Sequence, residues 1–488
     1  MSNPAQLHDA PFVPAAPVQA HKGQTLGALL VVIVVPALCI VGNQAGLLRI
    51  VFPALSFVIG LFLFWRSKPL YVGYVCWLWF LTPFLRRMAD FQSGWEATSA
   101  VLLAPYLVTG ISAITLITSL KYLGDRRSLS FVCAFLGIFY GTTIGLVRFP
   151  LVSVLQALLN WAVPVIFGFF VYRYRELYPE FRKVIEKSFL YGVLLTGVYG
   201  VYQFFNLPDW DRLWMLNVQM NSFGTAEALK VRVFSTMNAP AIFAAVTACG
   251  VLLLFNTKGR LRLLSAACGF LALILTMSRA SWLSLVAGFI YLAFQMEMRQ
   301  RLKLAMVAAA CIVLLVVSTQ IPAVGDLVTQ RIQTFSDPSN DVSYDARIEG
   351  HEQAFEVIKQ EPFGEGLGST DTEHGTEGDD DAIGPHDSTL LEFLYSLGWI
   401  GSLIYATGLG TLGVQLMRKR ETDSFVLSSK AIIIGFVAQC LLNSVMLGVL
   451  GFMIWTFASM GLAQMDCVEK TLNEPEQPGI EAAASMAA

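Results

Sequence analysis

Long apolar stretches recur along the whole of this 488-residue chain and leave little of it for a surface in water. Hydrophobic residues make up 55% of the chain and charged residues only 14%, whereas roughly a quarter of a soluble globular protein is charged. The mean hydropathy is +0.60. Because an apolar stretch of about 20 residues crosses the core of a bilayer as an α-helix, the sequence predicts an all-α polytopic membrane protein.

The stretches predict about 12–14 transmembrane helices, of which the shorter ones are near the lower limit of length for a span. They cover residues 25–42, 47–65, 69–85, 99–119, 129–147, 151–172, 187–206, 238–256, 261–277, 281–295, 303–319, 388–416, 428–446 and 447–463. Residues 431–463 could also form one helix followed by a re-entrant segment.

Five segments follow from these spans. They are a disordered N-terminus (1–24), transmembrane helices 1–11 (25–319), a long loop with short helices (320–387), the C-terminal transmembrane helices (388–465) and a disordered tail (466–488). If the N-terminus is cytoplasmic, most of the 33 Lys and Arg fall in inward-facing segments, as the positive-inside rule requires. Both termini are then cytoplasmic, and the long loop faces outward.

The long loop, residues 320–387, holds sixteen Asp and Glu against three basic residues, so it neither enters lipid nor binds a polyanion as a whole. A helix is expected from Asp345, its N-cap, to Gln360, with Pro362 ending it. Its apolar face is expected to carry Ile348, His351, Phe355 and Ile358. Arg347 then lies in the first turn, where free backbone N–H groups and the helix dipole favour an anionic ligand.

Three glycines, Gly364, Gly366 and Gly368, follow the expected helix. A glycine run lets a backbone approach a bulky ligand closely, although the run alone is a weak signal. It does not follow a strand, which excludes a nucleotide-binding loop, and the chain has no nucleic-acid-binding motif. A ligand of this loop is thus expected to be neither a nucleotide nor a nucleic acid.

Three groups of residues occur in a characteristic order. The C-terminal group is Arg331, Asp341, Ser343, Arg347, Pro362, Gly364, Gly366, His386, Glu392, Gly398 and Gly401, and the upstream groups are Arg232–Pro240 and Ser278–Trp282. Together they resemble the O-antigen ligase and O-antigen polymerase superfamily over roughly residues 232–401. Members often have Asn after the His, where this chain has Asp387, and Gly before Thr, where it has Ser235. The acidic insertion at residues 371–381 is also unusual.

The resemblance implies a GT-C-like glycosyltransferase of the bacterial inner membrane, with its active site facing the periplasm. It also implies metal-independent, inverting transfer of a glycan from undecaprenyl diphosphate to a sugar hydroxyl, without a cofactor. Other polysaccharide assembly proteins are expected as further partners, and nucleic acid is not. The residue types suit this chemistry, because guanidiniums stabilise the charge that grows on a departing diphosphate and an imidazole titrates near neutral pH.

The histidines provide the candidate base. By its place in the motif, His386 is the expected catalytic base or acceptor-orienting group; the alternative is a solvated histidine that caps the span from Ser388. His351 is a second candidate, but its place on the apolar face of the expected helix favours packing. His374 lies among acidic residues that could bind a divalent cation, although their spacing favours a solvated loop. No metal site is therefore predicted.

Three arginines are predicted to bind the substrate diphosphate: Arg232, Arg279 and Arg347. Arg279 lies at the outer end of a span, where basic residues are scarce, so a phosphate contact is favoured over snorkelling to the interface. Arg232 precedes the span from Asn238 and is favoured as an anion ligand mainly by the resemblance. Arg347 could instead pair with the acidic residues beside it.

Two further arginines, Arg86 and Arg87, also face outward after a span. They are predicted to guide the anionic donor toward the site. Asp90 follows closely, so a local ion pair is the alternative. Arg331 is interpreted as structural.

Two classes of function remain. The first is an enzyme, either a polymerase that joins lipid-linked repeat units into exopolysaccharide or O-antigen, or a ligase that moves a finished chain to lipid A core. The predicted number of spans favours the polymerase. The second is a lipid-linked sugar transporter or flippase, which should carry ionisable residues within its spans and often two similar halves. The spans here are nearly free of charge, so the enzyme is favoured.

Overall fold

The computed structural model describes residues 22–218, 221–299, 301–302, 305–306, 309, 313, 316, 320, 325, 351–352, 354–369, 388–418 and 423–473. Within this part of the chain the regular structure is helical, and the only pairing of extended backbone is an antiparallel bridge between Gly224 and Val231. The predicted all-α fold is confirmed.

The first half of the chain forms a series of helices that are joined mostly by short turns. They are α1 (Lys22–Val41), α2 (Ala45–Arg66), α3 (Lys68–Ser93), η1 (Ala100–Leu102), α4 (Leu103–Gly110), α5 (Ala113–Thr118), η2 (Leu120–Gly124), η3 (Arg126–Ser128), α6 (Leu129–Arg148), α7 (Leu151–Arg173), η4 (Arg175–Leu177), α8 (Tyr178–Asn206), α9 (Asp209–Val218) and η5 (Asn221–Phe223).

The second half supplies the remaining helices of the bundle. They are α10 (Pro240–Asn256), α11 (Leu261–Leu275), α12 (Arg279–Gln295), α16 (Thr389–Met417), α17 (Ser424–Gln439) and α18 (Gly448–Asn473). Residues 354–360 are also helical.

Seven helical stretches in the described part of the chain are long and apolar enough to cross a bilayer, so this is a multi-pass membrane protein. They are Ala45–Arg66, Ala100–Thr118, Arg126–Arg148, Leu151–Arg173, Arg175–Asn206, Thr389–Met417 and Gly448–Met465. Shorter apolar helices cover Leu29–Val41, Pro240–Phe255, Leu261–Leu275 and Ser424–Gln439.

Several helix bounds differ from the hydropathy prediction. Helix α3 continues two turns beyond the expected span 69–85, to Ser93, because Arg86, Arg87 and Asp90 are buried in protein rather than exposed to lipid or water. In the region 431–463 the chain forms two separate helices, α17 and α18. The termini were predicted disordered up to residue 24 and from residue 466, but α1 begins at Lys22 and α18 ends at Asn473.

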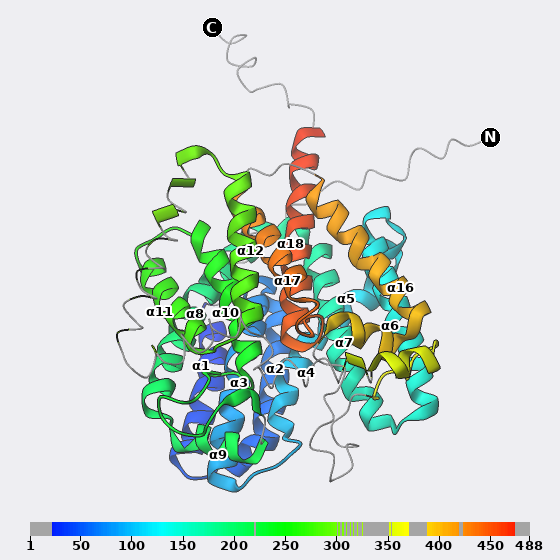
Figure 1. Ribbon diagram of the computed structural model, residues 1–488. Coiled ribbons are helices and arrows are strands. Elements are labelled where there is room, and N and C mark those ends of the chain that lie inside the picture. The colour runs from blue at the N-terminus through cyan, green and yellow to red at the C-terminus, as the bar shows by residue number, and fades with distance from the viewer. Residues whose placement is uncertain are drawn as a thin grey trace, which may run out of the picture.

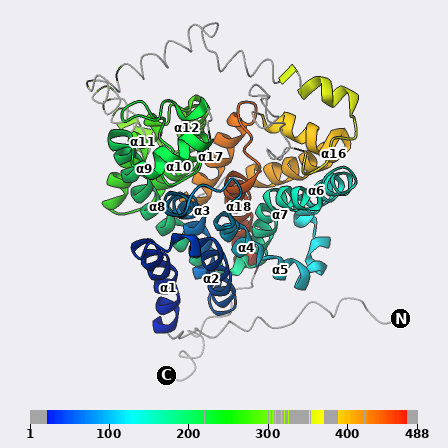
Figure 2. The same ribbon diagram turned by 90° about the horizontal axis from the view of Figure 1, so that it is seen from below.

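The helices pack side by side around α17 and α18 (Figure 1). Seen from below, α8 to α12 lie on one side of this central pair, and α5 to α7 with α16 lie on the other (Figure 2). Helix α18 packs against α7 and α17, α12 packs against α17, and α16 packs against α6. The apolar part of α18 is 89% buried, so this helix is the core of the bundle rather than a lipid-facing span.

The glycine run packs against helix backbone rather than lining a ligand site. Helix α16 is interrupted at Gly398, which has φ 60° and ψ −171°. Carbonyl groups just before the break therefore lack the N–H group four residues later that they would bond in a regular helix. Glu365 and Gly366 donate their N–H groups to the carbonyls of Tyr395 at 2.8 Å and Ser396 at 3.1 Å. A Cβ on Gly366 would lie 2.4 Å from the Gly145 nitrogen of α6. The glycines are therefore needed for close helix packing.

The helix before the glycine run has a different buried face from the predicted one. Its described residues end at Gln360, before Pro362, as expected. Ile358 is buried, but Phe355 is 44% exposed, and the second buried residue is Ala354. His351 is half-buried. The expected start of this helix at Asp345 lies outside the described residues.

Candidate functional site

The segment from Arg232 to Ala239 is an irregular strap that leads into α10. Arg232 donates its N–H to the carbonyl of Phe223 at 2.8 Å, and Val233 donates to the carbonyl of Leu275 at 3.0 Å. The second bond fixes the strap against the last residue of α11. Arg232 itself is half-buried, so its side chain keeps access to the surface.

Arg279 is the first residue of α12 and follows a tight turn from α11. Met277 in that turn has φ 56°, a left-handed conformation that reverses the chain within three residues. The indole N–H of Trp282 donates to the carbonyl of Leu273 at 3.3 Å and fastens the two helices together. Since Val233 is bonded to Leu275, the same turn carries Arg279 beside the strap that holds Arg232.

The start of α12 is linked to the start of α16 through the end of α17. The hydroxyl of Ser281 donates to Gln439 Oε1 at 3.5 Å. Cys440, the residue that follows α17, accepts at its carbonyl from the Thr389 N–H at 2.9 Å and from the Ser388 hydroxyl at 3.4 Å. Ser388 is the second residue after His386. One end of the bundle, called here the arginine end, thus carries Arg232, Arg279 and the start of α16.

Glu392, a residue of the family motif, is buried in the first turns of α16. Its carboxylate is 1% exposed and accepts a hydrogen bond from the Ser444 hydroxyl. Nearby, the Thr389 hydroxyl donates to the carbonyl of Asn443 at 2.8 Å and accepts from the N–H of Val445 at 3.0 Å. These contacts hold the start of α16 against the turn between α17 and α18.

Three helices begin at the arginine end without a side-chain hydrogen bond to their first N–H groups. The N-cap residues are Ala239 for α10, Ser278 for α12 and Ser388 for α16. The first N–H groups of a helix have no partner within it, and the helix dipole makes this end positive. Together with the arginines, these helix ends suit a phosphate group.

Two of the predicted site residues lie outside the part of the chain that the structure describes. They are His386, the candidate base, and Arg347, the third candidate diphosphate ligand. Arg331 and His374 also lie outside it. The structure therefore brings together the segments of Arg232 and Arg279, and places Ser388, two residues after His386, at the same end.

Arg86 occurs in the local ion pair with Asp90 that the sequence offered as the alternative, whereas Arg87 occurs in a buried ion pair with a distant residue. Arg86 is 4% exposed, lies 3.2 Å from Asp90 and stacks between the rings of Trp95 and Trp214. Arg49 pairs with the same carboxylate at 3.0 Å. Burial raises the pKa of the Asp90 carboxyl, and the two arginines oppose this shift.

Arg87 is 1% exposed and points to a different partner, Asp211 of α9, with the two charged groups 3.3 Å apart. The sequence did not single out Asp211 or the buried Gln203 beside it. No short-range pattern could have found them, because Asp211 is far from Arg87 in the chain and its helix, α9, has the ordinary pattern of a surface helix.

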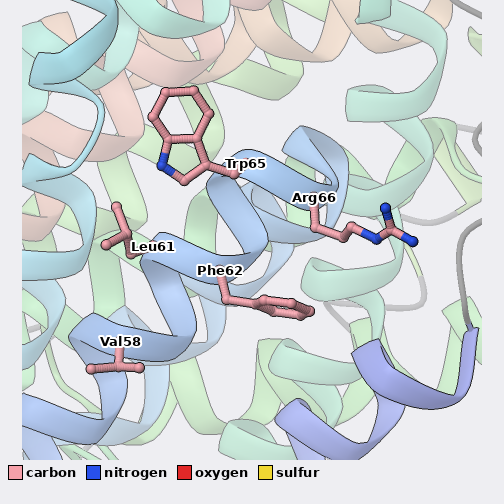
Figure 3. A pocket seen from close by; sticks show the side chains of 5 residues that line it. All are labelled: Val58, Leu61, Phe62, Trp65 and Arg66. Carbon is pink, nitrogen blue, oxygen red and sulfur yellow. The ribbon is translucent and has the colours of Figure 1, made fainter.

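A groove of about 430 Å³ lies elsewhere on the bundle, along α2 (Figure 3). It is lined by Val58, Leu61, Phe62, Trp65 and Arg66. The groove lies at the opposite end of α2 from Arg49. Arg49 itself pairs with Asp90, the partner of Arg86. Apart from Arg66 and the indole N–H of Trp65 the lining of the groove is apolar, and none of the candidate site residues lines it, so it is not the candidate site.

The comparison with known families bears on the same region. Residues 264–406 match the family model described as O-antigen ligase. This part of the chain is similar to an O-antigen ligase domain. The predicted superfamily is thereby confirmed. No curated protein sequence matches the chain.

The O-antigen ligase domain includes most of the candidate site. It runs from residue 264 in α11 through the turn at Met277 and the whole of α12 to residue 406 in α16, past the break at Gly398. Arg279, Arg347 and His386 lie inside it, whereas Arg232 lies before it and Gln439 after it. An O-antigen ligase domain indicates a glycosyltransferase-like enzyme that uses a lipid-linked glycan donor and an acceptor.

Proposed function

We propose that this protein polymerises undecaprenyl-diphosphate-linked oligosaccharide repeat units into exopolysaccharide or O-antigen at the periplasmic face of the bacterial inner membrane. The observation that supports the proposal best is the hydrogen-bonded junction at the arginine end. There the Val233–Leu275 bond and the Thr389–Cys440 bond gather Arg232, Arg279 and the start of α16 in and beside an O-antigen ligase domain.

The proposed reaction is a single inverting displacement. The oxygen of the acceptor sugar hydroxyl attacks the anomeric C1 of the donor glycan. The bond between C1 and the diphosphate oxygen breaks, and undecaprenyl diphosphate leaves with that electron pair. The hydroxyl proton passes to the imidazole of His386, which acts as the general base. Chain connectivity keeps His386 two residues from Ser388, which is bonded to Cys440.

The guanidiniums of Arg232, Arg279 and Arg347 would hold the diphosphate of the donor. Negative charge on the leaving oxygen grows as the C1–O bond breaks, so fixed donors that face it stabilise the transition state more than the ground state. The uncapped starts of α10, α12 and α16 add N–H groups and the positive ends of the helix dipoles, which act on the diphosphate in the same sense as the guanidiniums. No general acid is needed, because a diphosphate leaves as an anion.

The ligase is the second candidate, and the description of the matched family as O-antigen ligase favours it. In that case the donor is a finished lipid-linked chain and the acceptor is a sugar of lipid A core. The same arginines and imidazole would serve, because both reactions displace the same diphosphate.

The test uses His386→Ala and Arg279→Ala variants in cells, with surface polysaccharide and lipid-linked intermediates measured together. Arg148→Ala is the matched control, because Arg148 is exposed and pairs with Glu361 at 2.8 Å and Glu365 at 3.0 Å. Lost polymer with single lipid-linked repeats supports the polymerase. Long lipid-linked chains that are not transferred support the ligase. Normal polymer in both site variants would overturn the site.

A further inference from the structure

The carboxylate of Asp211 is completely buried and serves as a hub for three donors. One oxygen lies 3.3 Å from Arg87. The other accepts hydrogen bonds from the amide of Gln203 at 2.6 Å and from the hydroxyl of Tyr199 at 2.7 Å. A buried carboxylate is stable only when it is paired and hydrogen-bonded in this way. Asp211 therefore joins α9 firmly to α3 and α8.

The partners of Asp211 hold the strap that carries Arg232. The guanidinium of Arg87 donates to the carbonyl of Met237 at 3.1 Å and to that of Ser235. The carbonyl oxygen of the Gln203 side chain accepts from the N–H groups of Phe234 at 3.0 Å and Ser235 at 2.8 Å. Arg87 and Gln203 thus bond two carbonyls and two N–H groups of the strap backbone.

The strap needs such support because its backbone is strained. Ser235 has φ 51°, a left-handed conformation that costs an L-residue free energy and persists only where the surroundings enforce it. Its hydroxyl donates to the carbonyl of Thr196 at 2.6 Å, and the side chain is fully buried. Without the contacts to Arg87 and Gln203, the strap would relax and Arg232 would shift relative to Arg279.

We infer that the buried Arg87–Asp211 pair is a positioning device that sets the strap, and with it Arg232, for the diphosphate of the donor. This inference rests on the proposed function. A buried ion pair stabilises a fold no better than well-packed apolar side chains of the same volume. A guanidinium can orient two carbonyls at once, which an apolar side chain cannot. The pair is thus placed where orientation matters, directly behind a candidate substrate-binding segment.

The first measurement does not depend on catalysis. Hydrogen exchange of the backbone amides at 233–237 is followed in the purified protein and in Asp211→Asn and Arg87→Met variants. We expect faster exchange in this strap, with the amides of α16 and α17 unchanged. The matched control is Arg182→Met, which removes a pair with Asp423 at 2.9 Å between α8 and α17 and leaves the strap unchanged. Unchanged exchange in both test variants would overturn the positioning device itself.

The second measurement separates positioning from stability. The double variant Arg87→Met/Asp211→Asn has no unpaired buried charge, and Asn can still accept from Gln203 and Tyr199. We expect it to recover the thermal stability lost in either single variant while its transfer rate remains about 10- to 100-fold low, mainly through a raised KM for the donor. The Arg87→Lys variant should recover only part of the rate, because an ammonium lacks the guanidinium fork.

Two outcomes would contradict the inference in different ways. Full recovery of both thermal stability and transfer rate in the double variant would show that the Arg87–Asp211 pair contributes only to the stability of the fold. Faster hydrogen exchange in the strap with a normal transfer rate would instead show that the position of Arg232 does not matter for the reaction. The pair would then have no positioning role in transfer. The first outcome leaves the proposed function intact, so the two failures are distinguishable.

Discussion

The N–H of Val233 lies 3.0 Å from the carbonyl oxygen of Leu275. This bond joins the residue after Arg232 to the last residue of α11, just before the turn that presents Arg279. Both bonded groups belong to the backbone. Replacing either arginine side chain therefore leaves the link intact, and such variants report on the guanidinium alone rather than on the fold.

Arg279→Lys tests whether the guanidinium itself is needed. Lysine keeps the charge but loses the planar fork that matches phosphate oxygens, so we expect the transfer rate to fall about 10- to 100-fold, roughly 1.4–3 kcal/mol in the barrier. The rate is measured in membranes with a purified lipid-linked donor. Arg148→Lys is the control and should retain the rate, since an exposed ion pair contributes about 1 kcal/mol or less. Equal rates for Arg279→Lys and the unchanged protein would contradict the phosphate contact.

Gly366→Ala tests the packing of the glycine run. Gly366 has φ 95°, and an added Cβ would lie 2.4 Å from a backbone nitrogen of α6. We expect a loss of roughly 3 kcal/mol or more, because strain and overlap add. Thermal unfolding in detergent measures it. Gly410→Ala in α16 is the control, since nothing lies within 4 Å of its added Cβ, and it should stabilise the helix slightly. A normal melting temperature for Gly366→Ala would refute this packing.

Ser235 provides a test of the strained strap. Its φ of 51° suits glycine. Ser235→Gly relieves strain but loses the bond to Thr196, so the two effects, each about 1 kcal/mol, should nearly cancel. Ser235→Val adds a β-branched side chain to a fully buried left-handed position and should cost about 3 kcal/mol. The free energies of unfolding of the two variants are measured from their unfolding curves. Equal values for the valine and glycine variants would contradict the left-handed conformation at this position.

The orientation in the membrane can be tested with single cysteines. Thr98 lies in the exposed turn after α3, at the arginine end, and Lys258 lies in the exposed turn between α10 and α11 at the other end. In a variant without the native cysteines, we expect a membrane-impermeant maleimide to label Thr98→Cys in cells whose outer membrane is permeabilised. Lys258→Cys should be labelled only after lysis of the inner membrane. The reverse pattern would place the arginine end in the cytoplasm.

Most of the helices could be predicted because apolar length alone defines a span. Helix α7, at Leu151–Arg173, differs from the expected 151–172 by one residue. The prediction failed where polar residues are buried in protein instead of meeting water. Helix α3 continues past Arg86 because Asp90 and Asp211 neutralise its charges, and hydropathy has no means of recognising such partners.

The candidate site was partly predictable for a similar reason. Arg232 and Arg279 stand out by their place in motifs at helix ends, and the structure carries them to one end of the bundle. The contacts that position them come from residues distant in sequence. Gln203, for example, bonds the backbone of Phe234 and Ser235, and nothing in the linear order near Gln203 indicates this. The packing of the glycine run against α6 could not be predicted, because close approach to a ligand and close approach to another helix require the same residue.

The hydrogen bonds on either side of residues 370–387 have a practical consequence. On one side, Leu367 donates to the Gly141 carbonyl at 2.9 Å, and Gly366 is bonded to α16. On the other, Ser388 and Thr389 are tied to Cys440. Each flank is secured by its own hydrogen bonds, and the entropic cost of closing a loop grows only slowly with its length. An epitope tag or a fluorescent protein inserted near residue 376 should therefore leave the protein folded, and such a fusion would allow it to be imaged in living cells.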